Sequence, residues 1–497
     1  MKNILAWALE VGRKRWQSAL AFALVLGFEL YNITAAAFWG DEAATISAST
    51  RTISQLFNLV RHVDAVHAVY YLGMHFWIQA FGPGELSLRL PEAIAASAAA
   101  AILFVILKKR TNTFSAIAAT MAFAMMPRVV WAAGIGRSYA FTILFGVILT
   151  WILLRITETK KAHRGWFFAY FAIAGFASVI FVFVLLMVAA QGLSLLLLRV
   201  SRANLWRFGL AALGAVAVAM PVAIAAKKQS FQIAWLSHVP PDAVNSIFGS
   251  VLFYSTNAVT ITFWSLVAIG LALLIWRRSR FGKTEKSASL ERLALPSVVV
   301  ALLPSTLIYV YSMFNKSLFD GRYFSFSAGA VAVLVAIAIY QLNFNWVRLV
   351  ALISVFAITI GPAVYWRQEY RFGNDYDQLS SLIQNQAKPG DAVLFAPLSK
   401  HCTGVCASSA AYPEAYKNLK IIGLLNENVR FGYLHDRFLP NETTVKQASH
   451  FKRVWYVTNV PADQRFDKGL VPGLLALGFR PTATHSLKFD SATLYTR

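Results

Sequence analysis

Charged side chains are scarce in this sequence. Only 14% of its 497 residues are charged and 57% are hydrophobic, whereas soluble domains carry roughly 25% charged residues. The apolar residues form runs of about 20 residues, which is the length of a membrane-crossing helix and about twice that of a barrel strand. Since backbone groups in hydrocarbon must be paired within helices or closed barrels, the sequence excludes a soluble fold for most of the chain. It predicts an α-helical polytopic membrane protein.

Acidic residues are also few. The chain has 23 Asp and Glu residues against 46 Lys and Arg residues, which gives a formal net charge of +23. The basic residues gather in short clusters at the ends of the apolar runs, which is typical of cytoplasmic loops rather than of a nucleic-acid surface. The sequence lacks a glycine-rich nucleotide fingerprint, and its first apolar run is too long for a cleavable signal core. We therefore expect membrane lipids as partners and no nucleic acid.

Hydropathy predicts about eleven membrane spans. Their ranges are 17–38, 88–107, 114–133, 138–154, two helices within 166–198, 208–226, 258–276, 294–314, 322–340 and 346–365. The shorter apolar piece Val66–Phe81 is rich in Tyr, Trp and His, so we expect it to lie along the outer membrane interface. Every large basic loop then falls on the cytoplasmic side. The prediction is a multi-pass protein of the cell's inner (plasma) membrane, with its N-terminus in the cytoplasm and its C-terminal domain outside.

The last quarter of the chain has the composition of a soluble domain. We predict a transmembrane domain, 1–365, with a first outer loop at about 39–87, and a small extracytoplasmic α/β domain, 366–497. The latter rests on strand-like runs at 391–396, 420–424 and 454–457 and on helix-like stretches at 376–386 and 471–477. Cys402 and Cys406 permit a disulfide in an oxidising space, and two free thiols are the alternative.

Two adjacent carboxylates, Asp41 and Glu42, follow the first span. Acidic residues at the outer end of a membrane helix are energetically unfavourable near lipid, so their presence there indicates a function. A carboxylate there can take a proton from an attacking hydroxyl or help to hold a divalent cation. The alternative is a solvated loop whose Asp caps the next helix. No complete set of metal ligands is recognisable in the sequence, so metal dependence stays open.

A second polar cluster comes later in the same outer loop. It consists of Asp64, His67, Tyr70 and Tyr71, and we expect it to bind the acceptor or to support the site. His62 and His67 are five residues apart and so do not share a helical face, which argues against a metal site. The alternative is that these polar residues mark the start of an interfacial helix.

Two arginine–tyrosine pairs lie at outer ends of later spans. They are Arg137 with Tyr139, and Arg322 with Tyr323. Basic residues are disfavoured on the outer side of the membrane, so an arginine there indicates an anionic partner. A guanidinium binds phosphate through two parallel hydrogen bonds. The alternative is that each side chain extends toward lipid headgroups. Because two spans carry the same pair, we predict one shared anionic ligand.

In their joint order, these motifs resemble the GT-C glycosyltransferases, in particular family 39-like members such as the protein mannosyltransferases and the lipid A aminoarabinose transferases. The resemblance covers about residues 15–340. It is carried by Asp41-Glu42, Val66-His67-Ala68-Val69-Tyr70-Tyr71, Arg89–Pro91, Arg137-Ser138-Tyr139-Ala140, Gln232–Leu236 and Arg322-Tyr323. The chain lacks the prolines that many members have beside the His and the two Tyr residues.

The resemblance implies an enzyme that takes a sugar from a polyprenyl-phosphate donor. The sugar would be a mannose-like hexose or arabinose, and the acceptor an envelope glycan, a glycolipid or a protein on the outer face. Asp41 would be the catalytic base, Glu42 would support either Asp41 or the acceptor, and the anomeric configuration would invert. Arg137 and Arg322, with Tyr139 and Tyr323, would bind the donor phosphate.

Two other classes of function compete with this interpretation. A transporter or flippase of a lipid-linked glycan tends to have repeat symmetry and ionisable residues near the membrane midplane. The predicted polar clusters instead gather at one face, which favours chemistry at the surface. A non-catalytic envelope assembly factor is the third hypothesis, and the combination of Asp41 with two outer arginines argues against it.

Overall fold

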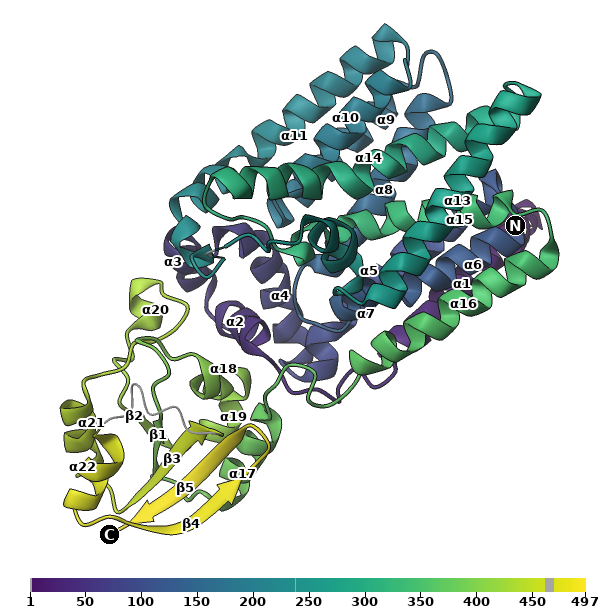
Figure 1. Ribbon diagram of the computed structural model, residues 1–497. Coiled ribbons are helices and arrows are strands. Elements are labelled where there is room, and N and C mark those ends of the chain that lie inside the picture. The colour runs from purple at the N-terminus through teal and green to yellow at the C-terminus, as the bar shows by residue number, and fades with distance from the viewer. Residues whose placement is uncertain (1, 237, 461–468) are drawn as a thin grey trace. The chain divides into compact units, whose positions relative to one another are not determined.

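The computed structural model describes residues 2–236, 238–460 and 469–497, with side chains from residue 16 onward (Figure 1). By packing, the chain forms two units. Unit 1 comprises residues 1–31 and 89–366, and unit 2 comprises residues 32–88 and 367–497. The first outer loop thus packs with the C-terminal segment, whereas its place in the sequence predicted a part of the transmembrane domain.

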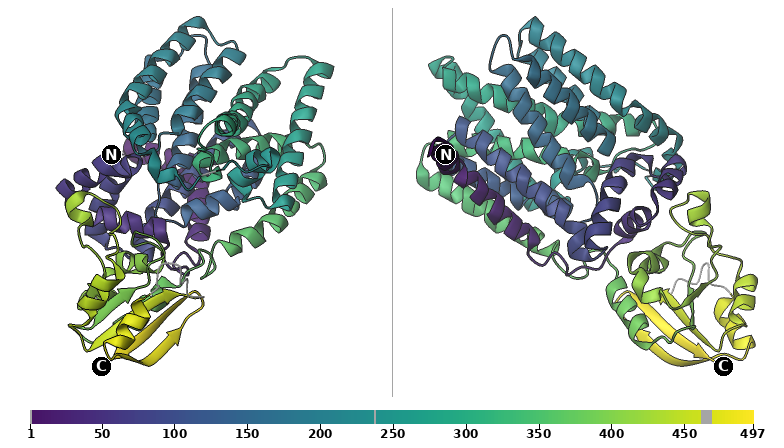
Figure 2. Two further views of the ribbon diagram at one scale, coloured as in Figure 1. Left: turned by 60° about the vertical axis from the view of Figure 1, so that its left-hand side comes forward. Right: turned by 180° about the vertical axis from the view of Figure 1, so that it is seen from behind.

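Unit 1 is a helical bundle in which long apolar helices run roughly side by side (Figure 2), joined by shorter helices such as α7 (Pro127–Ala133) and α12 (Val251–Phe253). The other helices are α1 (Lys2–Leu30), α5 (Glu85–Arg110), α6 (Thr113–Ala124), α8 (Tyr139–Thr157), α9 (Arg164–Ile180), α10 (Val184–Leu197), α11 (Arg202–Lys228), α13 (Asn257–Phe281), α14 (Glu285–Phe314), α15 (Ala328–Gln341) and α16 (Asn345–Tyr365). A 3₁₀ segment, Gly321–Ser327, leads into α15. The prediction of a mainly helical membrane fold is confirmed.

Within the described residues, seven helices are long and apolar enough to cross a membrane, and an eighth crossing results if α6 and α7 form one bent span. The bend of 62° falls just before Pro127, whose ring and missing N–H interrupt the helical hydrogen-bond ladder. There are also three shorter apolar helices: Trp16–Leu30, α9 and α10. With these, each of the predicted span ranges contains a helix. The number of crossings itself stays a prediction.

Close helix packing in unit 1 depends on a glycine in α13. A Cβ atom on Gly270 would collide with the Cα atom of Ala338 in α15. Small residues of this kind let membrane helices approach closely. Since α15 is the most buried of the candidate spans, this contact lies at the centre of the bundle.

Replacing Gly270 by Ala is therefore expected to destabilise the protein by about 1–3 kcal/mol, as overpacking does. The matched control is Gly209→Ala in α11, where nothing lies within 4 Å of an added Cβ. Thermal unfolding of both variants in detergent measures the difference. Equal unfolding temperatures would contradict the proposed close approach.

Unit 2 contains a small mixed sheet. Its strands are β1 (Ala392–Phe395), β2 (Lys420–Ile422), β3 (Arg453–Asn459), β4 (Arg480–Ser486) and β5 (Asp490–Thr496), in the order β2-β1-β3-β5-β4. β1 pairs in parallel with β2 and β3, and β5 pairs antiparallel with β3 and β4. The small C-terminal α/β domain is confirmed, and the hairpin of β4 and β5 was not predicted.

Helices cover both faces of this sheet (Figure 1). α17 (Tyr376–Gln386) lies on one face, and α21 (Asn441–Ala448) and α22 (Leu470–Ala476) lie on the other. The remaining short helices of this segment are α18 (Ser408–Ala411), α19 (Pro413–Tyr416) and α20 (Asn428–Phe431). Alternate residues of each strand point to opposite faces, so Trp455 and Val457 of β3 pack toward α17, while Val454 and Tyr456 pack toward α21 and α22. Cys402 and Cys406 form a disulfide beside the first of these cores.

The first outer loop adds three helices to unit 2. They are α2 (Gly40–Ser49), α3 (Ile53–His62) and α4 (Ala68–Phe81), with a 3₁₀ turn at Ala65–His67. The side chain of Thr52 caps α3 by accepting a hydrogen bond from the backbone N–H of Gln55. None of the three passes the length and composition test for a membrane span among the described residues, and α4 coincides with the segment predicted to lie along the interface.

Two fully buried carboxyl groups, Asp375 and Asp490, meet where α17 begins and β5 starts. Asp375 accepts a hydrogen bond from the backbone N–H of Phe489, and Asp490 accepts one from the Asn459 side chain, both at 2.9 Å. Burial, together with the hydrogen bond and the charge of Asp375, raises the pKa of Asp490 from 3.8 to about 8. The Asp490 carboxyl is therefore largely protonated at neutral pH.

The raised pKa of Asp490 predicts a pH dependence of stability. Because the folded pKa exceeds the unfolded value, folding takes up a proton, and stability falls as pH rises from about 4 to about 8. Hydrogen exchange of α17 and β5 in the full chain should accelerate across this window. The Asp490→Asn variant should flatten the profile, since an amide can bond Asp375 without titrating. An unchanged profile in this variant would assign the dependence to other groups.

Candidate active site

Asp41 and Glu42 occupy the first turn of α2. Glu42 is fully buried, and its carboxylate accepts a hydrogen bond from the backbone N–H of Trp39 at 3.4 Å. Asp41 is partly exposed, and its backbone carbonyl accepts a hydrogen bond from the Thr45 hydroxyl. Of the two carboxylates, Asp41 is thus the one that a substrate can reach, while Glu42 holds the start of the helix.

The second polar cluster is brought together at the other end of α2. The Tyr71 hydroxyl donates a hydrogen bond of 2.7 Å to the Asp64 carboxylate, and the rings of His67 and Tyr70 lie against Tyr71. Ser49, the last residue of α2, donates to the carbonyl of Tyr71. Ser49 lies roughly 12 Å along the helix from Asp41 at 1.5 Å per residue, and the Tyr71 hydroxyl links Asp64 to α4.

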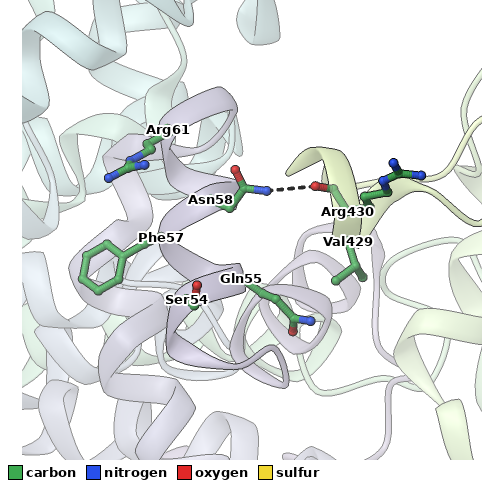
Figure 3. Close-up of a pocket in the computed structure, with 7 residues that line it drawn as sticks. All are labelled: Ser54, Gln55, Phe57, Asn58, Arg61, Val429 and Arg430. Carbon is green, nitrogen blue, oxygen red and sulfur yellow. Dashed lines mark hydrogen bonds between the residues drawn. The ribbon is translucent and has the colours of Figure 1, made fainter.

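An open polar groove of about 500 Å³ lies between α3 and α20 (Figure 3). The Asn58 side chain donates a hydrogen bond to the carbonyl of Arg430 across it. Figure 3 shows the side chains of Arg61 and Arg430 pointing away from one another. The two cations of the groove therefore do not converge on one point.

The two arginine–tyrosine pairs of unit 1 lie close together. Phe181 connects them, because its ring centroid lies 5.8 Å from that of Tyr139 and 5.8 Å from that of Tyr323. Arg137, in the turn before α8, is 95% buried. Helices far apart in the sequence thus bring both predicted pairs to one region.

The charges in this region are mostly positive. Arg322 forms an ion pair of 3.0 Å with Asp320, and its guanidinium lies over the ring of Trp235 at 5.2 Å. Buried Arg128, which was not among the predicted site residues, lies within electrostatic range of both Asp320 and Arg322. A phosphate would therefore be attracted to this end of unit 1.

Arg128 also fixes the local backbone. Its guanidinium donates to the carbonyls of Ser250 and Val251 and to the hydroxyl of Tyr254, at 2.5–2.8 Å. These acceptors are neutral, so the bonds satisfy the donors without cancelling the positive charge. A charged residue inside a predicted span was the signal that could have identified it.

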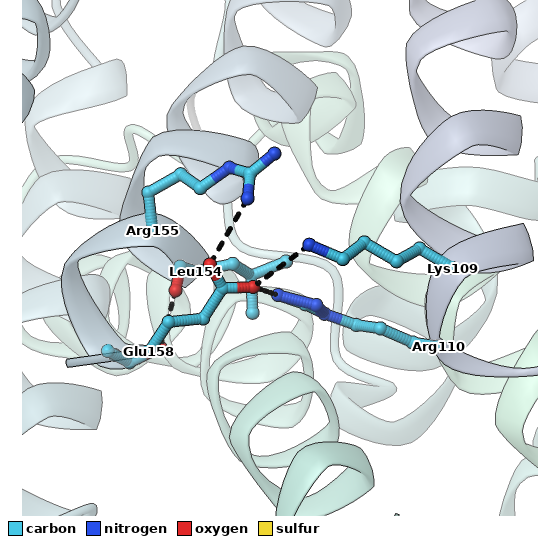
Figure 4. A network of polar contacts seen from close by, with 6 residues as sticks. Lys109, Arg110, Leu154, Arg155 and Glu158 are labelled. Atoms are coloured by element: carbon cyan, nitrogen blue, oxygen red, sulfur yellow. Dashed lines mark hydrogen bonds and ion pairs between the residues drawn. The ribbon is translucent and has the colours of Figure 1, made fainter. Parts of the chain in front are cut away.

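A basic cluster marks the opposite end of unit 1 (Figure 4). Glu158, just after α8, forms ion pairs with Arg110 at 2.6 Å, Arg155 at 3.2 Å and Lys109 at 3.8 Å. Partial burial would raise the pKa of Glu158, but the cations, Arg110 foremost, hold it below the ordinary value. Arg137 precedes the 19-residue helix α8, so the two ends are separated by roughly 28 Å at 1.5 Å per residue.

The predicted residues therefore divide between the units. Asp41, Glu42 and the Asp64 cluster belong to unit 2, whereas Arg137 and Arg322 with their tyrosines belong to unit 1. Their action on one ligand stays a prediction. In the described part of the chain, no group of three or more His, Cys, Asp or Glu side chains is arranged to hold a metal ion.

Known proteins resemble this chain in both sequence and fold. Residues 67–225 match the family model of dolichyl-phosphate-mannose-protein mannosyltransferases. ArnT from Cupriavidus metallidurans, solved in the apo state and bound to undecaprenyl phosphate, superposes with a TM-score of 0.60 at 14% identity, over 96% of this chain and 97% of ArnT.

A second solved structure shares this fold over part of its length. The arabinofuranosyltransferase AftD from Mycobacteria superposes with a TM-score of 0.53 at 13% identity, over 97% of this chain and 40% of AftD. No curated protein sequence matches the chain.

Proposed function

We propose that the chain is a GT-C glycosyltransferase that transfers a sugar from a polyprenyl-phosphate carrier to an envelope acceptor, as the family match over residues 67–225 and the likeness to the fold of ArnT support. The observation that carries this proposal is the cationic region of unit 1. There Arg137-Tyr139 and Arg322-Tyr323 share Phe181 as a neighbour, and Arg128 adds a buried positive charge. The likeness to ArnT, solved with undecaprenyl phosphate, supports a lipid phosphate as the ligand.

In the proposed reaction, Asp41 takes the proton of the acceptor hydroxyl. The hydroxyl oxygen then forms a bond to the anomeric carbon, while the bond from that carbon to the phosphate oxygen breaks. The polyprenyl phosphate leaves with its negative charge, which Arg137 and Arg322 neutralise through charge-assisted hydrogen bonds. One direct displacement inverts the anomeric configuration.

The proposed donor sugar is a mannose-like hexose or arabinose, and the proposed acceptor is an envelope glycan, a glycolipid or a protein. To test this proposal, the purified chain is reconstituted with an extract of envelope acceptors. The donor is undecaprenyl-phosphate-linked mannose or arabinose, radiolabelled in the sugar. We expect label to move from the lipid to an acceptor, with inversion. Retention of all label on both lipids would contradict the proposal.

We further propose that unit 2 and the Arg137 end of unit 1 face the outside of the inner membrane. The disulfide of Cys402 and Cys406 fits an oxidising compartment, and the cluster around Glu158 fits a cytoplasmic end. A cysteine at exposed Lys109 should react with a membrane-impermeant maleimide only from the cytoplasmic side. A cysteine at exposed Lys316 is the control and should react only from outside; the reverse pattern would overturn this orientation.

A further inference from the structure

The hydroxyl of Tyr412 connects the C-terminal segment to the segment that carries Asp41. It accepts a hydrogen bond of 3.0 Å from the backbone N–H of Phe38 and donates one of 2.8 Å to the carboxylate of Glu85. Phe38 lies three residues before Asp41, and Glu85 begins α5. One phenol thus joins both ends of the first outer loop, across more than 300 residues of sequence.

The environment of Tyr412 favours this arrangement. Its ring packs against Phe38 with centroids 5.2 Å apart, and the neighbouring Trp39 stacks on Phe372 at 5.1 Å. Burial, and then the charge of Glu85, raises the pKa of the Tyr412 hydroxyl well above its ordinary value. The phenol therefore keeps the proton that it donates to Glu85.

The disulfide supports Tyr412 from the other side. Cys406 lies in the 3₁₀ turn that leads directly into α18, and Tyr412 follows α18. The Cys402–Cys406 bond closes the short loop before this helix. A constrained loop restricts where α18 can place the tyrosine, because cross-linking removes alternative backbone conformations.

We propose that Tyr412 is a positioning residue, through which the C-terminal domain fixes the N-terminal end of α2 and with it the carboxylate of Asp41. This inference rests on the proposed role of Asp41 as the base. Tyr412 itself does not touch the reacting atoms. Its hydroxyl holds the backbone from which α2 starts, so its loss allows Asp41 to move relative to a bound acceptor.

The test compares Tyr412→Phe with Tyr416→Phe in the full chain. Tyr416 is a matched control, because its buried hydroxyl bonds Ser408 within the same domain. We expect Tyr412→Phe to lower kcat by about 10- to 100-fold, as a misplaced catalytic group does, with the donor KM within about twofold of the wild-type value. Tyr416→Phe should retain kcat within about threefold, since no hydrogen bond of its hydroxyl reaches α2 among the described contacts.

Hydrogen exchange of residues 38–49 gives a readout that does not depend on catalysis. Tyr412→Phe should accelerate exchange there, while Glu85→Gln, which keeps the acceptor oxygen, should retain both protection and activity. Equal kcat in the two tyrosine variants, or a loss of kcat without faster exchange in α2, would overturn the positioning role. Failure of the proposed function is distinguishable, because the wild-type chain would then show no sugar transfer at all.

Discussion

Replacing Asp41 by Asn is expected to lower the rate of sugar transfer about a thousandfold, within the 10²–10⁴-fold range of general-base catalysis. The amide keeps the size of the side chain but cannot take the acceptor proton. Because Asp41 is partly exposed at the first turn of α2 while Glu42 is buried in the helix cap, the fold should tolerate this change. Initial rates at saturating donor in proteoliposomes measure the effect.

The control for this variant is Glu414→Gln. Glu414 undergoes the same loss of a carboxylate, but its side chain is 75% exposed and pairs only with the exposed Lys417 among the described ion pairs. Transfer by this control should stay close to wild type. If Asp41→Asn retained transfer within a few-fold of wild type, Asp41 would not be the base and the mechanism would fail.

The second large effect is expected at Arg322. Replacing it by Ala should raise the donor KM by about 10- to 100-fold, because a charge-assisted hydrogen bond contributes about 1.5–3 kcal/mol and each 1.4 kcal/mol is tenfold. Arg137→Ala should act in the same direction. Titration of donor lipid against initial rate separates this change in KM from a change in kcat.

Arg430→Ala serves as the matched control, since it removes an exposed arginine of unit 2. Arg322→Lys should recover only part of the affinity, because an ammonium lacks the two-pronged geometry that suits phosphate. Should Arg322→Ala reduce protein abundance while leaving the donor KM unchanged, its ion pair with Asp320 would be purely structural.

The membrane helices were predictable because their signal is local. A run of about 20 apolar residues has few alternatives to a membrane helix, and the long run 166–198 is divided into α9 and α10 as predicted. The hairpin of β4 and β5 escaped prediction for the opposite reason. β4 is an edge strand whose residues, Arg480–Ser486, are largely exposed and polar, so neither hydrophobicity nor alternation distinguishes it from a loop.

The candidate site was predictable only in part. Asp41, Arg137 and Arg322 stand out because charge beside apolar runs is costly. The packing of residues 32–88 with residues 367–497 could not be predicted, because hydropathy contains no information about tertiary contacts. Tyr412 is the clearest case, because its hydrogen bond to Phe38 joins residues 374 positions apart. A tyrosine in a polar segment has no local feature that reveals such a partner.

The central claim is that one carboxylate and two guanidinium groups act on a single phospho-sugar. A cryo-EM structure of the chain in lipid nanodiscs with bound polyprenyl phosphate tests it most directly. The account predicts the phosphate within about 3 Å of both the Arg137 and Arg322 side chains, with the Asp41 carboxylate facing the position of the sugar. A phosphate bound elsewhere, or an Asp41 side chain that no sugar on that phosphate could approach, would contradict it.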